Sequence, residues 1–152
     1  MIPFAPPRID DEIIEAVTTV LKSGWITTGP TTKRFEDEIA HYLDAEKVIC
    51  LNSATAGMEL ALRWFGIGPG DEVITACFTY VATVEVIGLL QLKPILVEVN
   101  PQTFNIEPQA IRNAITEKTK AIVPVHLYGQ SADMESIMDI ANEFNLFVIE
   151  DT

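Results

Sequence analysis

Basic residues are scarce in this chain of 152 residues, which carries 10 Lys and Arg against 22 Asp and Glu and a formal net charge of −12. A protein that tracks nucleic-acid phosphates needs a basic face, so the charge argues against that class of function. A negative net charge still allows one small anionic ligand to be held by backbone amides.

Cysteine is also scarce. Cys50 and Cys77 are too few for a disulfide framework, and neither histidine is close to them in a metal-ligand spacing, so we expect no metal. No apolar run approaches the length that spans a bilayer, and the first residues lack a basic and apolar leader. We therefore expect a cytoplasmic protein without nucleic-acid or membrane partners.

Short β-rich runs and helical patterns alternate from Lys47 onward. The runs begin 22 to 27 residues apart, and parallel strands need crossovers of at least a dozen residues, so consecutive βα units are predicted. Nearly continuous apolar runs are typical of strands covered on both faces. The pattern predicts an α/β fold, a three-layer α/β/α sandwich with a mostly parallel sheet. The predicted strands are 47–51, 72–76, 94–99, 119–125 and 146–150, and the helices between them 56–65, 81–90, 108–115 and 134–144.

Two more helices are predicted before this alternation. An acidic stretch at 10–12 begins the first helix, and Gly24 ends it. Residues 24–30 have the composition of a loop. Thr31 or Thr32 is expected to cap the second helix.

Ligands of open α/β sheets bind beyond the carboxyl ends of the strands, which directs attention to the segments that follow each predicted strand. Asn52–Gly57 follows the first of them and opens a helix with small residues. Its first-turn N–H groups and the helix dipole can hold an anion. The alternative is that Ser53 or Thr55 only caps the helix.

Three other corners carry candidate side chains. Phe78 and Tyr80 offer rings on which a planar ligand can stack, unless they are core residues. His126 either contacts a ligand or forms a structural hydrogen bond. Asp151 lies beyond the last predicted strand, where it faces the ligand or caps a following helix. No catalytic triad can be assembled from these residues.

Six motifs in a fixed order resemble the DegT/StrS group of pyridoxal-phosphate-dependent nucleotide-sugar aminotransferases of fold type I, and among its members those that aminate a UDP-4-keto-pentose look most similar. The resemblance implies that the chain is the N-terminal part of the large domain of that fold. The motifs are Gly24-Trp25-Ile26-Thr27-Thr28-Gly29-Pro30, Asn52-Ser53-Ala54-Thr55-Ala56-Gly57, Gly68-Pro69-Gly70-Asp71-Glu72-Val73-Ile74, Phe78-Thr79-Tyr80-Val81-Ala82-Thr83, Pro124-Val125-His126-Leu127-Tyr128-Gly129 and Ile149-Glu150-Asp151.

The resemblance implies pyridoxal 5'-phosphate as the cofactor. Tyr80 would stack on its pyridine ring, and Asp151 would pair with the ring nitrogen and keep it protonated. The full set of implied cofactor contacts is Ser53, Ala54, Thr55, Ala56, Tyr80, His126 and Asp151. The implied contacts to the sugar nucleotide are Trp25, Thr27, Thr28 and Gly29.

The implied activity is amino transfer from glutamate to a nucleotide-diphosphate keto-sugar, in the biosynthesis of cell-surface polysaccharide or lipopolysaccharide. A homodimer is expected. Residues 1–30 would form an N-terminal arm, a helix and a substrate-side loop, and 31–152 a partial cofactor-binding domain.

The Schiff-base lysine of the family follows the Asp within a segment that these 152 residues do not include. None of the six lysines present lies at the predicted binding edge, so we expect an N-terminal fragment with no catalytic residue and no activity of its own. Two alternatives stay open. One is a keto-sugar dehydratase of the same family, and the other is a non-catalytic α/β nucleotide-binding module. A dinucleotide-binding domain is disfavoured because the glycine fingerprint is absent.

Overall fold

The computed structural model describes residues 5–152, and the chain divides into two compact units at Cys50 and Leu51, each of which is described by itself. The first unit contains helices α1 (Asp11–Ser23) and α2 (Pro30–Leu43). The carboxylate of Asp10 accepts a hydrogen bond from the Ile13 N–H and caps α1, while Gly24 ends it at φ 74°. The predicted start and end of this helix are confirmed.

The predicted cap of the second helix at Thr31 or Thr32 is wrong, because α2 already begins at Pro30 with Gly29 before it. Proline suits the first helical position, since its φ is already helical and its missing N–H would have no partner there. The first unit has no interior of its own: between residues 5 and 50 no side chain is buried. Apolar side chains of α1 and α2 such as Ile14 and Phe35 are more than half exposed.

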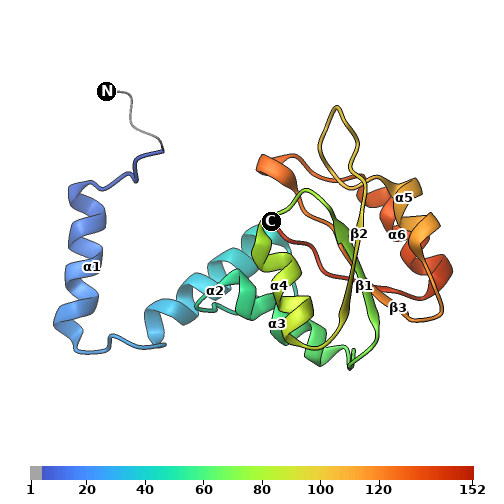
Figure 1. Cartoon of the computed structure of the whole chain (residues 1–152). Coiled ribbons are helices and arrows are strands. Elements are labelled where there is room, and N and C mark those ends of the chain that lie inside the picture. The colour runs from blue at the N-terminus through green and yellow to red at the C-terminus, as the bar shows by residue number, and fades with distance from the viewer. Residues whose placement is uncertain (1–4) are drawn as a thin grey trace. The chain divides into compact units, whose positions relative to one another are not determined.

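The second unit is built on a four-stranded sheet. Its strands are β1 (Glu72–Ala76), β2 (Lys93–Val97), β3 (Thr119–Val123) and β4 (Phe147–Val148). They are all parallel and lie in the order β2-β1-β3-β4 (Figure 1). The predicted parallel sheet is confirmed.

Helices cover both faces of this sheet and give the predicted three layers. On one face, Val73 and Ala121 pack with Leu62 of α3 (Ala54–Trp64) and Ile87 of α4 (Val81–Leu89). On the other face, the buried core joins β1 and β3 to α5 (Pro108–Ala114) and α6 (Met134–Phe144). Alternate residues of a strand point to opposite faces, so neighbouring β1 residues belong to different cores.

The predicted strand at 47–51 is wrong. Its residues have no strand assignment, and within residues 5–152 no strand pairs with them. A strand needs a neighbour to satisfy its backbone groups, so apolar character alone does not make one. The Ile49 and Leu51 side chains are 63% and 48% exposed.

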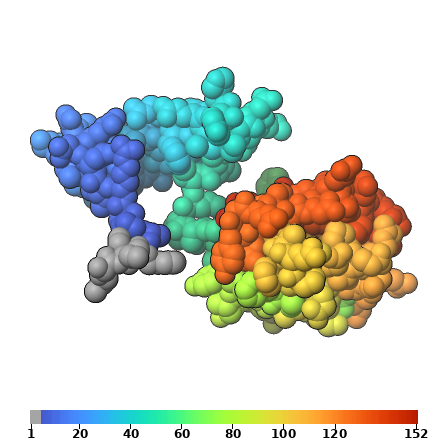
Figure 2. Space-filling model, turned by 90° about the horizontal axis from the view of Figure 1, so that it is seen from above, coloured from blue at the N-terminus to red at the C-terminus, as the bar shows by residue number. Residues whose placement is uncertain are grey.

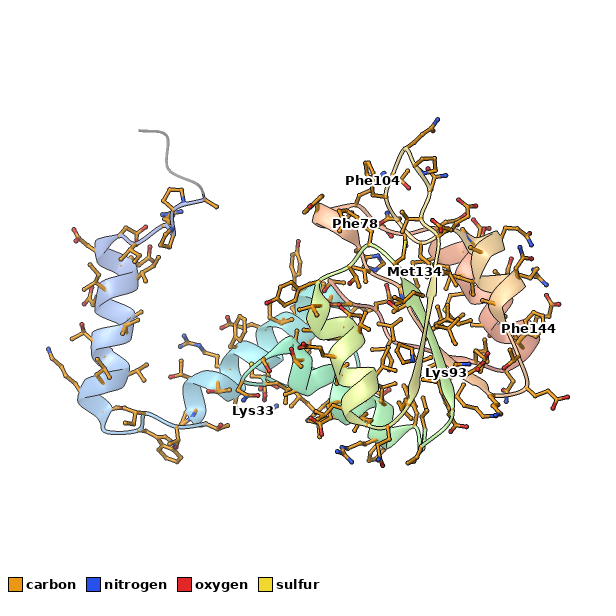
Figure 3. The ribbon with its side chains drawn as sticks, in the orientation of Figure 1. Lys33, Phe78, Lys93, Phe104, Met134 and Phe144 are labelled. Carbon is orange, nitrogen blue, oxygen red and sulfur yellow. The ribbon has the colours of Figure 1, made fainter. Side chains whose placement is uncertain are left out.

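The amino edge of the sheet contains a carboxylate whose partners are all protein groups. Glu72 is buried, and its two oxygens accept hydrogen bonds from the Thr116 hydroxyl and from the Lys93 ammonium, the latter at 2.9 Å. Lys93 begins the neighbouring strand (Figure 3). The hydrogen bond from Thr116, and next the one from Lys93, lower the pKa of Glu72 below its ordinary value of 4.5.

Glu72→Gln should therefore lower the urea midpoint of unfolding at pH 7, where the wild-type carboxylate is ionised and doubly bonded. Since the pKa is lowered in the fold, this stabilisation is complete above pH 4.5 and is lost as the pH falls through the lowered pKa. The wild type and the variant should converge in acid, while Glu117→Gln on the exposed loop should match the wild type throughout. If the urea midpoints of the wild type and Glu72→Gln differed as much at about pH 3 as at pH 7, the ionised Glu72 carboxylate would not be the source of the stabilisation.

Candidate functional site

Parallel strands bring their carboxyl ends to one edge of a sheet, and the candidate residues of the second unit gather there. The edge is formed by the corner 77–80 after β1, the corner 124–130 after β3 and the final residues 149–152. The start of α3 also faces this edge, since the helix leads through a short connection to the amino end of β1. Figure 1 shows the C-terminus beside the first turn of α4.

Asp151 is held through its backbone by the segment that continues β3. Its N–H donates to the Pro124 carbonyl at 2.9 Å, and its carbonyl accepts from the His126 N–H at 2.9 Å. These bonds form an isolated parallel bridge between Val125 and Asp151. The backbone of Asp151 is therefore fixed, although the regular strand β4 ends three residues earlier.

The Asp151 carboxylate is bonded by a residue of α4. The Thr83 hydroxyl donates to Oδ2 of Asp151 at 2.6 Å and lies 3.0 Å from the Thr79 hydroxyl. Thr83 is 1% exposed. Sequence reasoning did not find Thr83, because a threonine inside an apolar helix carries no local signal of a partner 68 residues away.

His126 uses both ring nitrogens within the protein. Nδ1 accepts a hydrogen bond from the Ala132 N–H at 3.1 Å, and Nε2 lies 2.8 Å from the Glu150 carboxylate. A ring nitrogen that accepts a hydrogen bond carries no proton. Nε2 therefore carries the proton and donates a hydrogen bond to the Glu150 carboxylate. His126 therefore forms the structural hydrogen bonds that one of the two alternatives expected. A contact between His126 and a cofactor stays a prediction.

Asn105 anchors the corner after β3 and was also missed by sequence reasoning. Its side-chain amide donates to the Gln130 and Ser131 carbonyls at 3.0 and 2.9 Å, and its Oδ1 accepts from the Leu127 N–H at 3.1 Å. This side chain is buried, and the segment around it packs against the segment after β3 (Figure 2). The bonds hold the short 3₁₀ turn Leu127–Gly129 in place.

The start of α3 has the local geometry of an anion site. Ser53 caps the helix by accepting the Ala56 N–H at 3.1 Å. The N–H groups of Ala54 and Thr55 have no acceptor within the helix, as in any first turn. They can bind an anion at the positive end of the helix dipole, and phosphate binding here stays a prediction.

The aromatic corner precedes α4. Tyr80 is the residue before the helix, and its side chain is 78% exposed, so it is not a core residue. Phe78 is 45% exposed and lies 5.9 Å from the Phe104 ring in a tilted arrangement (Figure 3). The exposed Tyr80 ring is therefore free to stack on a planar group.

The loop expected to contact substrate belongs to the first unit. The Trp25 Nε1 donates to the Thr28 carbonyl at 3.0 Å and closes the loop on itself. The indole also covers Gly29, where an added Cβ would lie 2.6 Å from Nε1. Glycine at this position is thus required by the close approach of the ring. Thr27 lines the same small cleft as Trp25 and Gly29.

The part of the chain that the structure describes lacks both a cluster of metal ligands and a helix that could span a membrane. Residues 5–152 contain no group of three or more His, Cys, Asp or Glu side chains arranged to hold a metal ion. They also contain no helix that is both long enough and apolar enough to span a membrane.

The model of the DegT/DnrJ/EryC1/StrS aminotransferase family matches residues 7–152. The chain belongs to this family. The resemblance carried by the six motifs is thereby confirmed. The prediction of a fold-type I architecture is confirmed as well, by the solved structures of aminotransferases that the chain matches.

Family members with known names extend well beyond this chain. The chain is 46% identical over 150 residues to the UDP-4-amino-4-deoxy-L-arabinose–oxoglutarate aminotransferase of Shewanella sediminis, covering 99% of this chain and 39% of that protein. It is 44% identical to the UDP-2-acetamido-2-deoxy-3-oxo-D-glucuronate aminotransferase of Pseudomonas aeruginosa, covering 95% and 40%. The chain therefore spans about two fifths of the length of these relatives.

The match with a solved protein likewise covers nearly all of this chain but less than half of that protein. A Streptococcus pneumoniae protein described as a sugar aminotransferase has been solved in a PLP form and a PMP form. Both match with a TM-score of 0.93 and 38% identity, and the match covers 99% of this chain and 42% of that one.

In this family member, His126→Ala should lower the free energy of unfolding by about 1–3 kcal/mol, because the buried Ala132 N–H would lose its acceptor. His41→Ala, on the exposed face of α2, is the matched control and should stay within about 0.5 kcal/mol of the wild type. Urea unfolding of both variants makes the comparison. If His126→Ala and the wild type had the same free energy of unfolding, the hydrogen bonds of the His126 ring would contribute nothing to stability.

Proposed function

We propose that the whole protein transfers an amino group from glutamate to a nucleotide-linked keto-sugar, with pyridoxal 5'-phosphate as cofactor. The observation that carries the proposal is the Asp151 carboxylate, fixed at the carboxyl edge of the sheet with one oxygen bonded to Thr83. Membership in the aminotransferase family supports the reaction class.

The residues present fit this cofactor. The first-turn N–H groups of α3 suit its phosphate, and the exposed Tyr80 ring suits its pyridine face. Within residues 5–152, no protein group donates a hydrogen bond to Oδ1 of Asp151, so this oxygen can accept one from a ring N–H. When bound, the cofactor supplies an electron-withdrawing ring for the carbon that loses its proton.

Each of these residues has a distinct task in the proposal. The Asp151 carboxylate holds a proton at the ring nitrogen, because an adjacent negative charge favours the protonated form. Ala54 and Thr55 orient the phosphate through their first-turn N–H groups, and Tyr80 fixes the plane of the ring. Trp25 with its loop contributes to the site for the sugar nucleotide.

The proposed substrate is a UDP-linked keto-sugar, because both named relatives act on UDP-sugars according to their names. The name of the Shewanella relative includes oxoglutarate, which is glutamate after loss of its amino group and so supports glutamate as donor. A homodimer in the cytoplasm is part of the proposal. The exposed apolar faces of α1 and α2 support a partner surface in the first unit.

The direct test supplies the whole protein with pyridoxal phosphate, glutamate and a UDP-4-keto-pentose or a UDP-3-keto-hexuronate. Mass spectrometry should detect an amino-sugar product and an equal amount of oxoglutarate. Omission of glutamate is the control and should abolish the product. Loss of water from the sugar without gain of nitrogen would identify a dehydratase and overturn the proposal.

Asp151→Asn should lower kcat/KM by about tenfold to a hundredfold. The variant lacks the charge-assisted hydrogen bond to the ring nitrogen, worth about 1.5–3 kcal/mol, in the step that removes a proton from the reacting carbon. A neutral amide cannot hold the ring nitrogen protonated. Asp139→Asn, on the exposed face of α6, removes the same charge away from the site and should leave kcat/KM unchanged. Steady-state rates of Asp151→Asn within about twofold of wild type would rule out this role.

A further inference from the structure

We propose that Thr83 is a positioning residue, which aims the Asp151 carboxylate at the cofactor site through a relay of two threonine hydroxyls. This inference rests on the proposed function and extends it to residues outside the proposed set of cofactor and substrate contacts. Three observations carry it: the direction of the hydrogen bonds, the burial of Thr83 and the support of Asp151 through both its backbone and its side chain.

The direction of the relay follows from the chemistry of its members. A carboxylate only accepts hydrogen bonds, so the single proton of the Thr83 hydroxyl is donated to Oδ2 of Asp151. The Thr79 hydroxyl, 3.0 Å from that of Thr83, must then be the donor between the two threonines. The order is Thr79 to Thr83 to Asp151, and each bond strengthens the next.

Thr83 departs from the ordinary behaviour of a helical threonine. Such a side chain commonly bonds a carbonyl of its own helix one turn back. Thr83 instead directs its hydroxyl away from α4 to a residue 68 positions later in the chain. Thr83 is 1% exposed, so water cannot substitute for the hydroxyl.

The relay leaves Asp151 a single orientation. Its backbone is bonded to Pro124 and His126, and its Oδ2 is bonded to a residue of α4. Among residues 5–152 no protein group donates to Oδ1, so this is the oxygen that a ligand can reach. The Thr83 N–H also donates to the Tyr80 carbonyl at 3.1 Å, so one helical turn connects the exposed ring and the oriented carboxylate.

The test uses the whole protein with three substitutions. Thr83→Val keeps the shape of the side chain and removes the hydroxyl, while Thr83→Ser keeps the hydroxyl. Thr75→Val is the matched control, because Thr75 is equally buried but its hydroxyl donates to the Val123 carbonyl and not to Asp151. Thr83→Val should lower kcat/KM about tenfold. Thr83→Ser should have a kcat/KM within about threefold of the wild-type value, and Thr75→Val should match the wild type.

Ring-nitrogen protonation gives a readout that a purely structural role would not change. With ¹⁵N-labelled pyridoxal phosphate bound, the ring-nitrogen chemical shift should move toward the unprotonated value in Thr83→Val. It should stay at the wild-type value in Thr83→Ser and Thr75→Val. A wild-type shift in Thr83→Val would overturn the inference, whatever the change in rate.

Thr79→Val covers the case in which Thr83→Val does not fold. Thr79 is less buried and its loss leaves the bond from Thr83 to Asp151 in place, so a twofold to fivefold loss of kcat/KM is expected, with a smaller ¹⁵N shift in the same direction. A Thr79→Val protein identical to wild type in both measurements would overturn the relay. Failure of the proposed function looks different, because the wild type itself would then show no transfer of nitrogen.

Discussion

Complete burial of β1 is the constraint on which the second unit depends. All five residues of this strand are buried, and β2 and β3 satisfy its backbone on either side. Each face of the strand contributes to a separate apolar core. Because both faces and both lateral sides are occupied, polar groups that need water or ligands can be placed only at the two ends of the strands. The location of the site follows from this exclusion.

The two ends of the sheet use carboxylates for opposite purposes. Glu72, at the amino end, receives a hydroxyl and an ammonium group, so both of its oxygens are bonded within the fold. Asp151, at the carboxyl end, receives one hydroxyl on one oxygen. A carboxylate whose bonds are all internal stabilises the fold, whereas one that keeps an oxygen for an outside donor can bind. The same residue chemistry therefore separates a structural end from the candidate binding end.

Sequence patterns predicted the layers, the parallel sheet and all four of the strands described in it, because buried parallel strands and their helices leave a strong pattern in the local sequence. The strand at 47–51 failed, since Ile49 and Leu51 are apolar without a neighbouring strand to pair with. Asp151 was predicted to lie at the carboxyl edge from its place after a strand, and the structure places it there. Thr83 and Asn105 were missed because their partners lie far away in sequence, and only folding shows which hydroxyl or amide meets which acceptor.

The separation between Thr83 and Asp151 also has a kinetic meaning. Glu72 and Lys93, which link β1 to β2, are 21 residues apart, whereas the bond that orients Asp151 closes a span of 68 residues. Each doubling of a closed loop costs about 0.6 kcal/mol of chain entropy, and contacts that are distant in sequence form late. By this measure the hydrogen bond from Thr83 to Asp151 carries a larger loop-closure cost than the ion pair between Glu72 and Lys93, so the orientation of the Asp151 carboxylate depends on the more costly of the two contacts.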